Sequence, residues 1–228
     1  MKVDSRIHSR GAGIVDPVLL REFAVHIVGV GAIGSTACRV LSQLGFTRFY
    51  LYDGDTVQPE NLGVQFYRQV DVGRPKVEAC RDVMASFLPH LDFEVHASHY
   101  AGEDLDGIVV VGVDSMQARA RVWKSLQARS AGKVSLYVDG RTAGEEVHVY
   151  AIRPSHPDDI MFYEESIVPD EKTTHMPCGQ QGAPHAQAVI AGIMGTQIVR
   201  WFRSEVFHSL VCMNLRMMHV TCVSSTKE

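Results

Sequence analysis

The 228-residue chain contains 46% hydrophobic and 21% charged residues and has a net charge of −4, the balance of an ordinary globular protein. Its length accommodates one full α/β domain and excludes two large ones, and the lack of a basic excess argues against a nucleic-acid partner. No segment approaches the roughly 20 consecutive apolar residues of a membrane helix, and the polar N-terminus lacks the apolar run of a signal peptide. We therefore expect a single cytoplasmic domain over residues 1–228, with no membrane partner.

The first predicted elements form a β-α-β unit. Residues 24–30 are an apolar run before glycines, as in a buried parallel strand. Residues 33–45 carry apolar side chains at helical spacing and end at Gly45, which favours helix termination. Residues 47–52 are rich in aromatic and β-branched side chains and predict a second strand. A right-handed crossover should connect the two parallel strands.

Beyond this unit, a loop over residues 53–75 leads into further helices and short apolar strands. Helices are predicted at 76–88, 115–130 and 184–202, and strands at 93–97, 108–113, 134–138, 146–152 and twice within 209–223. This alternation is typical of an α/β fold with a Rossmann-like, doubly wound, mostly parallel sheet, closed here by C-terminal antiparallel strands.

Residues 153–177 interrupt the alternation. They contain four prolines and many charges and show no periodicity. Because long structureless segments in compact domains are usually functional or disordered, we predict a crossover loop here. We expect it to stay flexible until a partner docks.

A glycine-rich turn follows the first predicted strand, where residues 29–34 read GVGAIG. Gly29 permits a tight turn, Gly31 lets a phosphate approach the backbone, and Gly34 lets the new helix pack closely on the sheet. The helix over 33–45 then directs free N–H groups and its positive dipole end at the phosphates, and Ala32 belongs to the same predicted nucleotide-binding turn.

Asp53 ends the second predicted strand, where an acidic side chain can accept hydrogen bonds from ribose hydroxyls. The turn and Asp53 together predict a nucleotide site. They fit a nicotinamide-dependent oxidoreductase as well as an ATP-dependent enzyme, so other residues must separate the two.

Two segments after the glycine turn separate these possibilities. Residues 53–65 read DGDTVQPENLGVQ and residues 73–78 read GRPKVE. They resemble the ThiF, MoeB and ubiquitin-activating family, which has D-x-D-x-V after the glycine turn, then N-L-x-R-Q, then G-x-P-K at the start of a helix, and the likeness extends over nearly the whole chain. It implies ATP- and magnesium-dependent adenylation of the C-terminal glycine of a small ubiquitin-like or sulfur-carrier protein.

The resemblance also implies roles for individual residues. Lys76 would hold the phosphates, since a helix N-terminus is a poor place for a merely solvated cation. Asp114, directly after an apolar strand, would help to hold magnesium, and a helix N-cap is a compatible alternative. Asn61 and Gln65 would contact the nucleotide, and Asp55 would either do so or fix its loop.

One departure from the family concerns its arginines. Val64 stands where the N-L-x-R-Q segment has arginine, so Arg68 or, less favourably, Arg74 would have to replace it. Family members also use an N-terminal arginine that often reaches the partner subunit of a homodimer, for which Arg6 and Arg10 are the candidates. A homodimer is therefore implied by the resemblance alone.

A cysteine offers a second chemical step. The five cysteines are Cys38, Cys80, Cys178, Cys212 and Cys222, with no CxxC pair, so we expect neither a disulfide framework nor a structural zinc. Cys178, followed by Gly182, has the family spacing of a cysteine linked to thio-transfer, and its thiolate could attack an acyl adenylate. His175 is a candidate base. A bystander cysteine in an enzyme that stops at the adenylate remains an equal alternative.

Two other functions stay open. A catalytically degenerate family member would bind a ubiquitin-like partner without activating it, and Val64 favours this alternative. An oxidoreductase on the same fold would explain the glycine turn and Asp53, although it leaves Lys76 and Asp114 unexplained.

Overall fold

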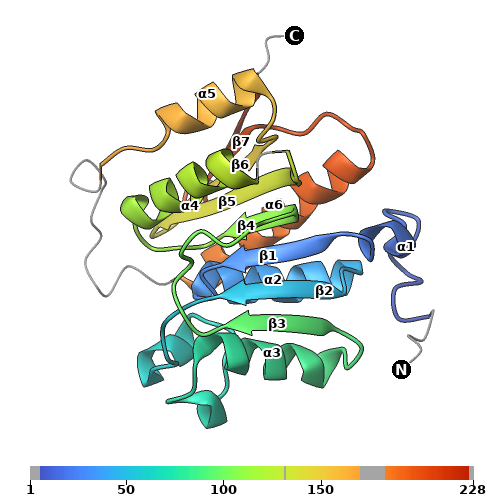
Figure 1. Ribbon diagram of the computed structural model, residues 1–228, viewed down its shortest axis with the longest axis vertical. Coiled ribbons are helices and arrows are strands. Elements are labelled where there is room, and N and C mark those ends of the chain that lie inside the picture. The colour runs from blue at the N-terminus through green and yellow to red at the C-terminus, as the bar shows by residue number, and fades with distance from the viewer. Residues whose placement is uncertain (1–5, 131, 170–182, 226–228) are drawn as a thin grey trace.

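The computed structural model describes residues 6–130, 132–169 and 183–225. Its centre is one eight-stranded sheet in the order β3-β2-β1-β4-β5-β6-β7-β8, with helices on both faces (Figure 1). The strands are β1 (Ala24–Val28), β2 (Arg48–Tyr52), β3 (Asp92–His96), β4 (Gly107–Val111), β5 (Val134–Ala143), β6 (Glu146–Ile152), β7 (Leu210–Asn214) and β8 (His219–Val223). The α-helices are α1 (Pro17–Leu20), α2 (Ala32–Leu44), α3 (Lys76–Phe87), α4 (Met116–Arg129), α5 (Pro157–Glu165) and α6 (Pro184–Phe202).

The predicted fold class is confirmed. Strands β3, β2, β1, β4 and β5 run parallel, and β5 to β8 continue the sheet as antiparallel neighbours. The chain leaves β1 toward β2 on one side and returns through β4 on the other. The carboxyl ends of β1 and β4 therefore meet at a topological switch point, where sheets of this kind bind ligands.

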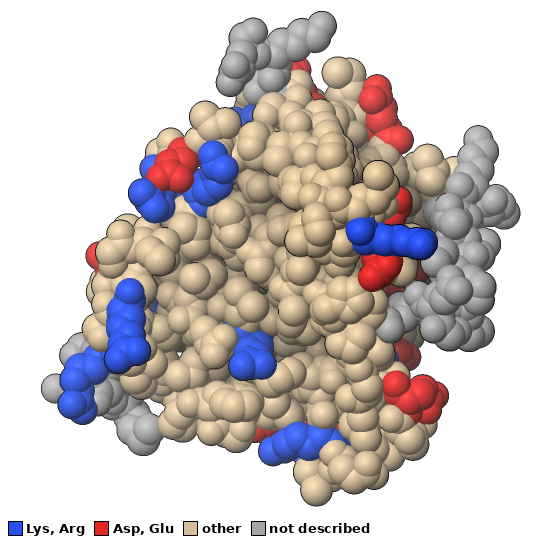
Figure 2. Space-filling model, turned by 180° about the vertical axis from the view of Figure 1, so that it is seen from behind, with Lys and Arg blue, Asp and Glu red and all other residues tan. Residues whose placement is uncertain are grey.

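The helices divide the apolar core into two layers. One layer joins the sheet to α2, α3 and α6, and the other joins it to α4 and α5. On α6, the exposed residues Ala188, Gly192 and Thr196 are small and uncharged. Figure 2 accordingly shows few charged side chains over the middle of the face behind the sheet. Beyond its first turn, α6 therefore exposes small, uncharged residues in place of a charged stripe.

The predicted structureless crossover is wrong for part of its length, since α5 occupies residues 157–165. The local signals were helical ones: a proline at the first position, then Asp158 and Asp159 in the first turn. Tyr163 is fully buried against Trp123 and so anchors α5 to α4. Residues 170–177 of the predicted crossover lie outside the described part of the chain.

The two strands after α4 also differ from expectation. β5 extends to Ala143 instead of ending near residue 138, because its second half pairs with β6 from Gly140↔Val149 to Ala143↔Glu146. The 53–75 segment is mostly loop, as predicted, with two short 3-10 turns. Among the described residues, we find no helix with the length and apolar character required to cross a membrane.

Two helical glycines give opposite predictions for the same substitution. A Cβ added at Gly34 would overlap the backbone oxygen of Gly29, whereas one at Gly192 would meet no described heavy atom within 4 Å beyond its own helix. We expect Gly34→Ala to lower the free energy of unfolding by at least about 2 kcal/mol through overpacking. Gly192→Ala should raise it by about 0.5–1 kcal/mol, because alanine is the better helix former. Urea denaturation of both variants measures the difference, and equal effects would contradict the described packing.

Candidate functional site

The glycine turn and the end of β4 meet backbone to backbone. Gly29 has a φ of +84°, and a Cβ there would come within 3.0 Å of the carbonyl group of Gly112. A Cβ at Gly112 would in turn lie 3.0 Å from the amide nitrogen of Gly34. Gly112 also donates its N–H to Val28 O at 2.9 Å. Only residues without side chains permit this approach, which brings the β1 and β4 loops together.

The start of α2 is open. Gly31 is the N-cap residue and provides no side-chain hydrogen bond to the helix, which begins at Ala32. Among the residues that the structure describes, no heavy atom lies within 4 Å of a Cβ placed at Gly31. The first N–H groups of α2 therefore adjoin free space, as an anion site at a helix N-terminus requires.

Asp53 fixes the turn from the end of β2. The residue is 7% exposed, and its Oδ2 accepts the N–H of Val30 while its Oδ1 accepts the N–H of Asp55, both at 2.9 Å. Burial raises the pKa of Asp53, although the two backbone donors and the Lys76 ammonium oppose this effect. Each carboxylate oxygen keeps a second acceptor position, so bracing the turn and binding a hydroxyl are compatible.

Lys76 begins α3 with its side chain only 10% exposed. Its Nζ lies 2.8 Å from Oδ2 of Asp55, whose side chain is 56% exposed. A backbone bridge between Thr56 and Pro75 holds the two segments together. The structure thus brings Lys76 and Asp55 into contact, and it gives Asp55 a loop-fixing role beside its predicted one.

Tyr67 was missed by sequence reasoning. It is 9% exposed, and its hydroxyl donates hydrogen bonds to Val30 O and Lys76 O. Burial raises the pKa of this phenol far above its ordinary value, so the hydroxyl remains a donor. A tyrosine two residues after Gln65 would have been the only local signal. It joins the glycine turn to the start of α3.

The two predicted amide residues differ. Asn61 Oδ1 accepts the N–H of Gln58 at 2.9 Å and so completes the first 3-10 turn. Gln65 Oε1 is buried without a hydrogen-bond partner among the described residues. A buried orphan amide oxygen is costly, so Gln65 is the better prepared of the two to bind a ligand.

Two of the arginine candidates, Arg68 and Arg74, already have a carboxylate partner. Asp71 is fully buried, and Arg68 donates from Nε and Nη2 to it at 2.9 Å each, while Arg74 Nη1 lies 3.3 Å away. Hydrogen bonds from Arg68 hold the pKa of Asp71 below its usual range. Arg6 and Arg10 are exposed in the turns before α1. A phosphate role for any of these arginines stays a prediction.

Asp114 follows β4 and is exposed. The N-cap of α4 is Ser115, whose Oγ accepts the N–H of Ala118 at 3.2 Å. The N-cap alternative for Asp114 is therefore wrong, and its side chain is exposed directly after β4. Val113, the residue before it, contacts that turn, because a Cβ at Gly29 would lie 3.1 Å from the Val113 side chain.

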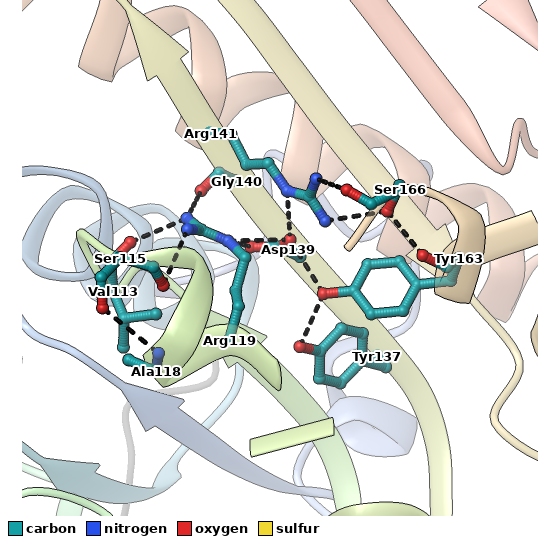
Figure 3. Close-up of polar contacts among 10 residues, drawn as sticks. All are labelled: Val113, Ser115, Ala118, Arg119, Tyr137, Asp139, Gly140, Arg141, Tyr163 and Ser166. Carbon is teal, nitrogen blue, oxygen red and sulfur yellow. Dashed lines mark hydrogen bonds and ion pairs between the residues drawn. The ribbon is translucent and has the colours of Figure 1, made fainter. Parts of the chain in front are cut away.

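A buried ion cluster adjoins the Asp114 loop (Figure 3), and no sequence motif predicts it. Asp139 is fully buried between Arg119 and Arg141, with N–O distances of 2.8 and 2.7 Å. Tyr163 donates its hydroxyl to Asp139 at 2.9 Å and also bonds to the hydroxyl of Tyr137. Burial, followed by the charge of Asp139, raises the pKa of both phenols, so they stay protonated.

Comparison with known proteins decides the family. The ThiF family matches residues 15–223, nearly the whole chain. This chain belongs to the ThiF family. Ubiquitin-like modifier-activating enzyme 5 of Arabidopsis thaliana is 40% identical over 98 residues, covering 40% of this chain and 23% of that protein. The rice protein of the same name is 31% identical over 151 residues, covering 64% of this chain and 31% of that protein. The chain thus spans less than a third of the length of these relatives.

Solved structures show the same fold as this ThiF family chain. PaaA superposes with a TM-score of 0.75 at 17% identity, covering 99% of this chain and 76% of PaaA. Escherichia coli MccB superposes with a TM-score of 0.73 at 14% identity, covering 100% of this chain and 73% of MccB. Such low identity extends the likeness to the architecture only.

Part of the site predicted from the ThiF family lies beyond the described residues. Cys178, Gly182 and His175 all fall within residues 170–182, so their roles stay predictions. Within the described ranges, no group of three His, Cys, Asp or Glu side chains is arranged to hold a metal ion.

A pair of substitutions tests the assignment at the start of α4. Ser115→Ala should lower the free energy of unfolding by about 1 kcal/mol, because it removes an N-cap acceptor. Asp114→Ala should leave that free energy nearly unchanged, since its exposed side chain does not cap the helix. Thermal and urea denaturation provide the measurement. The assignment is wrong if Asp114→Ala proves the more destabilising change.

Proposed function

We propose that this chain uses ATP and magnesium to adenylate the C-terminal glycine carboxylate of a small ubiquitin-like or sulfur-carrier protein. The observation that carries the proposal is the meeting of the glycine turn with the Asp114 loop at the switch point, through the contact of Gly29 with Gly112. Membership of the ThiF family and likeness to enzymes named ubiquitin-like modifier-activating enzyme 5 support it.

The described residues fit a bound nucleotide. Free space beside Gly31 leaves room for phosphates at the start of α2, and the orphan Oε1 of Gln65 offers a buried acceptor. Asp53 supplies further acceptors for ribose hydroxyls. One solved structure of Escherichia coli MccB, which shares this architecture, was determined with ATP.

Adenylation joins two anions, so the protein must neutralise charge and align the reactants. The carboxylate oxygen attacks the α-phosphorus, the bond to the bridging oxygen breaks, and pyrophosphate leaves. Lys76 would bind phosphate oxygens through its largely buried ammonium, exchanging or sharing its contact with Asp55. Magnesium, when bound, neutralises triphosphate charge, and the exposed Asp114 would hold it from the opposite loop.

A second step through Cys178 extends the proposal. Its thiolate would attack the carbonyl carbon of the acyl adenylate, form a thioester and expel AMP, with the thiol proton passing to a base or to solvent. The spacing of Cys178 and Gly182 supports this step. The competing outcome, in which catalysis ends at the adenylate, is separated by experiment below.

Substitution of the two charged residues tests the first step. Lys76→Ala and Asp114→Ala should each lower partner-dependent ATP–pyrophosphate exchange by about 100-fold or more, because each removes transition-state charge stabilisation. Exchange is assayed with purified ubiquitin-like and sulfur-carrier proteins that end in glycine. Lys124→Ala, at an exposed position on α4, is the matched control and should exchange as the wild type does. An ATP–pyrophosphate exchange rate equal to that of the wild type in either test variant would contradict the proposed adenylation site.

Substitution of the cysteine tests the second step. Cys178→Ala should leave exchange intact and remove any thiol-labile covalent adduct with the partner protein, because only the acceptor nucleophile is lost. Cys222→Ala, at an exposed cysteine on β8, is the control and should retain the adduct. Mass spectrometry after incubation with ATP reads out the adduct, and its absence in the wild type would end the thioester hypothesis.

One observation favours a second candidate, a family member that binds its partner without activating it. Val64 replaces the family arginine, and Arg68, its nearest substitute, is paired with Asp71. Such a protein would bind a glycine-terminated ubiquitin-like protein and show no exchange even as the wild type. A fluorescence titration with NADH covers the oxidoreductase alternative.

A further inference from the structure

The ion cluster described above places two guanidinium groups on one carboxylate. Asp139 is fully buried, and the side chains of Arg119 and Arg141 are 6% and 12% exposed. Buried ion pairs recover their desolvation cost poorly, so such a cluster is weak evidence for added stability. The other hydrogen bonds that the two guanidinium groups donate therefore give better evidence for the role of the cluster.

Arg119 holds the loop that carries Asp114. Its Nη2 donates to Val113 O at 2.7 Å and to Gly140 O at 3.0 Å. The register of β4 with β5 ends at Val111↔Asp139, so both carbonyl groups lie beyond the last paired residues. The guanidinium satisfies oxygens that the separating strands leave without a mutual partner.

The Val113 carbonyl is the one that matters for Asp114. A peptide unit is planar, so the oxygen of Val113 shares a plane with the nitrogen and Cα of Asp114. Arg119 itself lies in the first turn of α4, and Ser115, the N-cap residue of this helix, directly follows Asp114. Arg119 thereby fixes the peptide from which the Asp114 side chain projects.

Arg141 holds the other side of the cluster. Its Nη1 donates to Ser166 O and its Nη2 to Ser166 Oγ, both at 3.0 Å, and its guanidinium lies 4.2 Å from the ring centre of Tyr150. Ser166 is the C-cap of α5 and lies in the middle of the predicted crossover over residues 153–177. Tyr163 ties α5 to Asp139 a second time.

We infer that Asp139 is a positioning residue whose single carboxylate aligns Arg119 on the Asp114 loop and Arg141 on the end of α5. The two segments are distant in sequence, and Figure 3 shows them converging on this one side chain. The link to magnesium rests on the proposed function, while the positioning of the two segments does not. A carboxylate is required, because an amide cannot accept from both guanidinium groups without turning its NH₂ toward one of them.

Hydrogen–deuterium exchange of the ligand-free protein tests the positioning directly. Asp139→Asn should speed amide exchange in peptides covering residues 112–115 and 164–169 by about 10-fold or more, as expected for local opening of a released segment. Arg141→Lys should speed exchange only in 164–169, because Arg119 keeps its carboxylate.

Asp159→Asn is the matched control for a buried carboxylate. Asp159 is fully buried and accepts from Arg153 at 2.8 and 3.0 Å, yet it has no described contact with the Asp114 loop. Asp159→Asn should destabilise the protein without changing amide hydrogen exchange in residues 112–115. All variants are compared at equal distances below their melting temperatures. Wild-type exchange at 112–115 in Asp139→Asn, or equal acceleration in Asp159→Asn, overturns the inference.

Magnesium dependence tests the functional consequence. At fixed ATP concentration, equilibrium binding of labelled ATP is measured as magnesium chloride is varied. Asp139→Asn should raise the half-saturating magnesium concentration about 10-fold, the usual loss when an outer partner of a metal ligand is removed, with little change in magnesium-free ATP binding. An unchanged magnesium requirement rejects the link to Asp114. Failure of the wild type to bind ATP rejects the proposed function instead. The hydrogen–deuterium exchange result would still test the positioning role of Asp139.

Discussion

The approach of three glycines, Gly29, Gly34 and Gly112, is the constraint on which the site depends. A side chain at Gly34 would force the first turn of α2 away from the end of β1, and one at Gly112 would be tightly packed against the same turn. With that approach in place, the open start of α2 and the Asp114 loop share one edge of the sheet. Asp53 and Tyr67 then hold the turn from β2 and from the loop before α3. Nucleotide chemistry at this edge follows from the packing of backbone on backbone.

Much of this arrangement could be predicted from sequence, because its signals are local. The apolar run of β1, the glycine spacing and Asp53 at the end of β2 lie within about 30 residues, as expected for a β-α-β nucleotide unit. The position of Asp114 follows from the end of β4 in the same way, whereas a role for Lys76 at the start of α3 is implied by the family resemblance. Contacts within these loops were harder to foresee, and the Lys76–Asp55 pair is one example.

The residues that sequence reasoning missed depend on tertiary contacts. Asp139 meets Arg119 from a distance of 20 residues and Tyr163 from 24, and no spacing rule marks such a meeting. The prolines and acids of residues 153–177 suggested a loop in place of α5, whereas the burial of this helix comes from Tyr163. The N-cap beside Asp114 fell one residue later than the alternative weighed, at Ser115, a position that local patterns resolve poorly.

The contrast between the two ion pairs of the site has a consequence for its response to salt. Asp55 is more than half exposed, so dissolved ions screen its attraction for Lys76 and leave the ammonium freer as ionic strength rises. Asp139 is out of reach of solvent, and its hold on Arg119 is screened far less. A change in ionic strength should therefore alter the electrostatic interactions of Lys76 much more than those that hold the Asp114 loop.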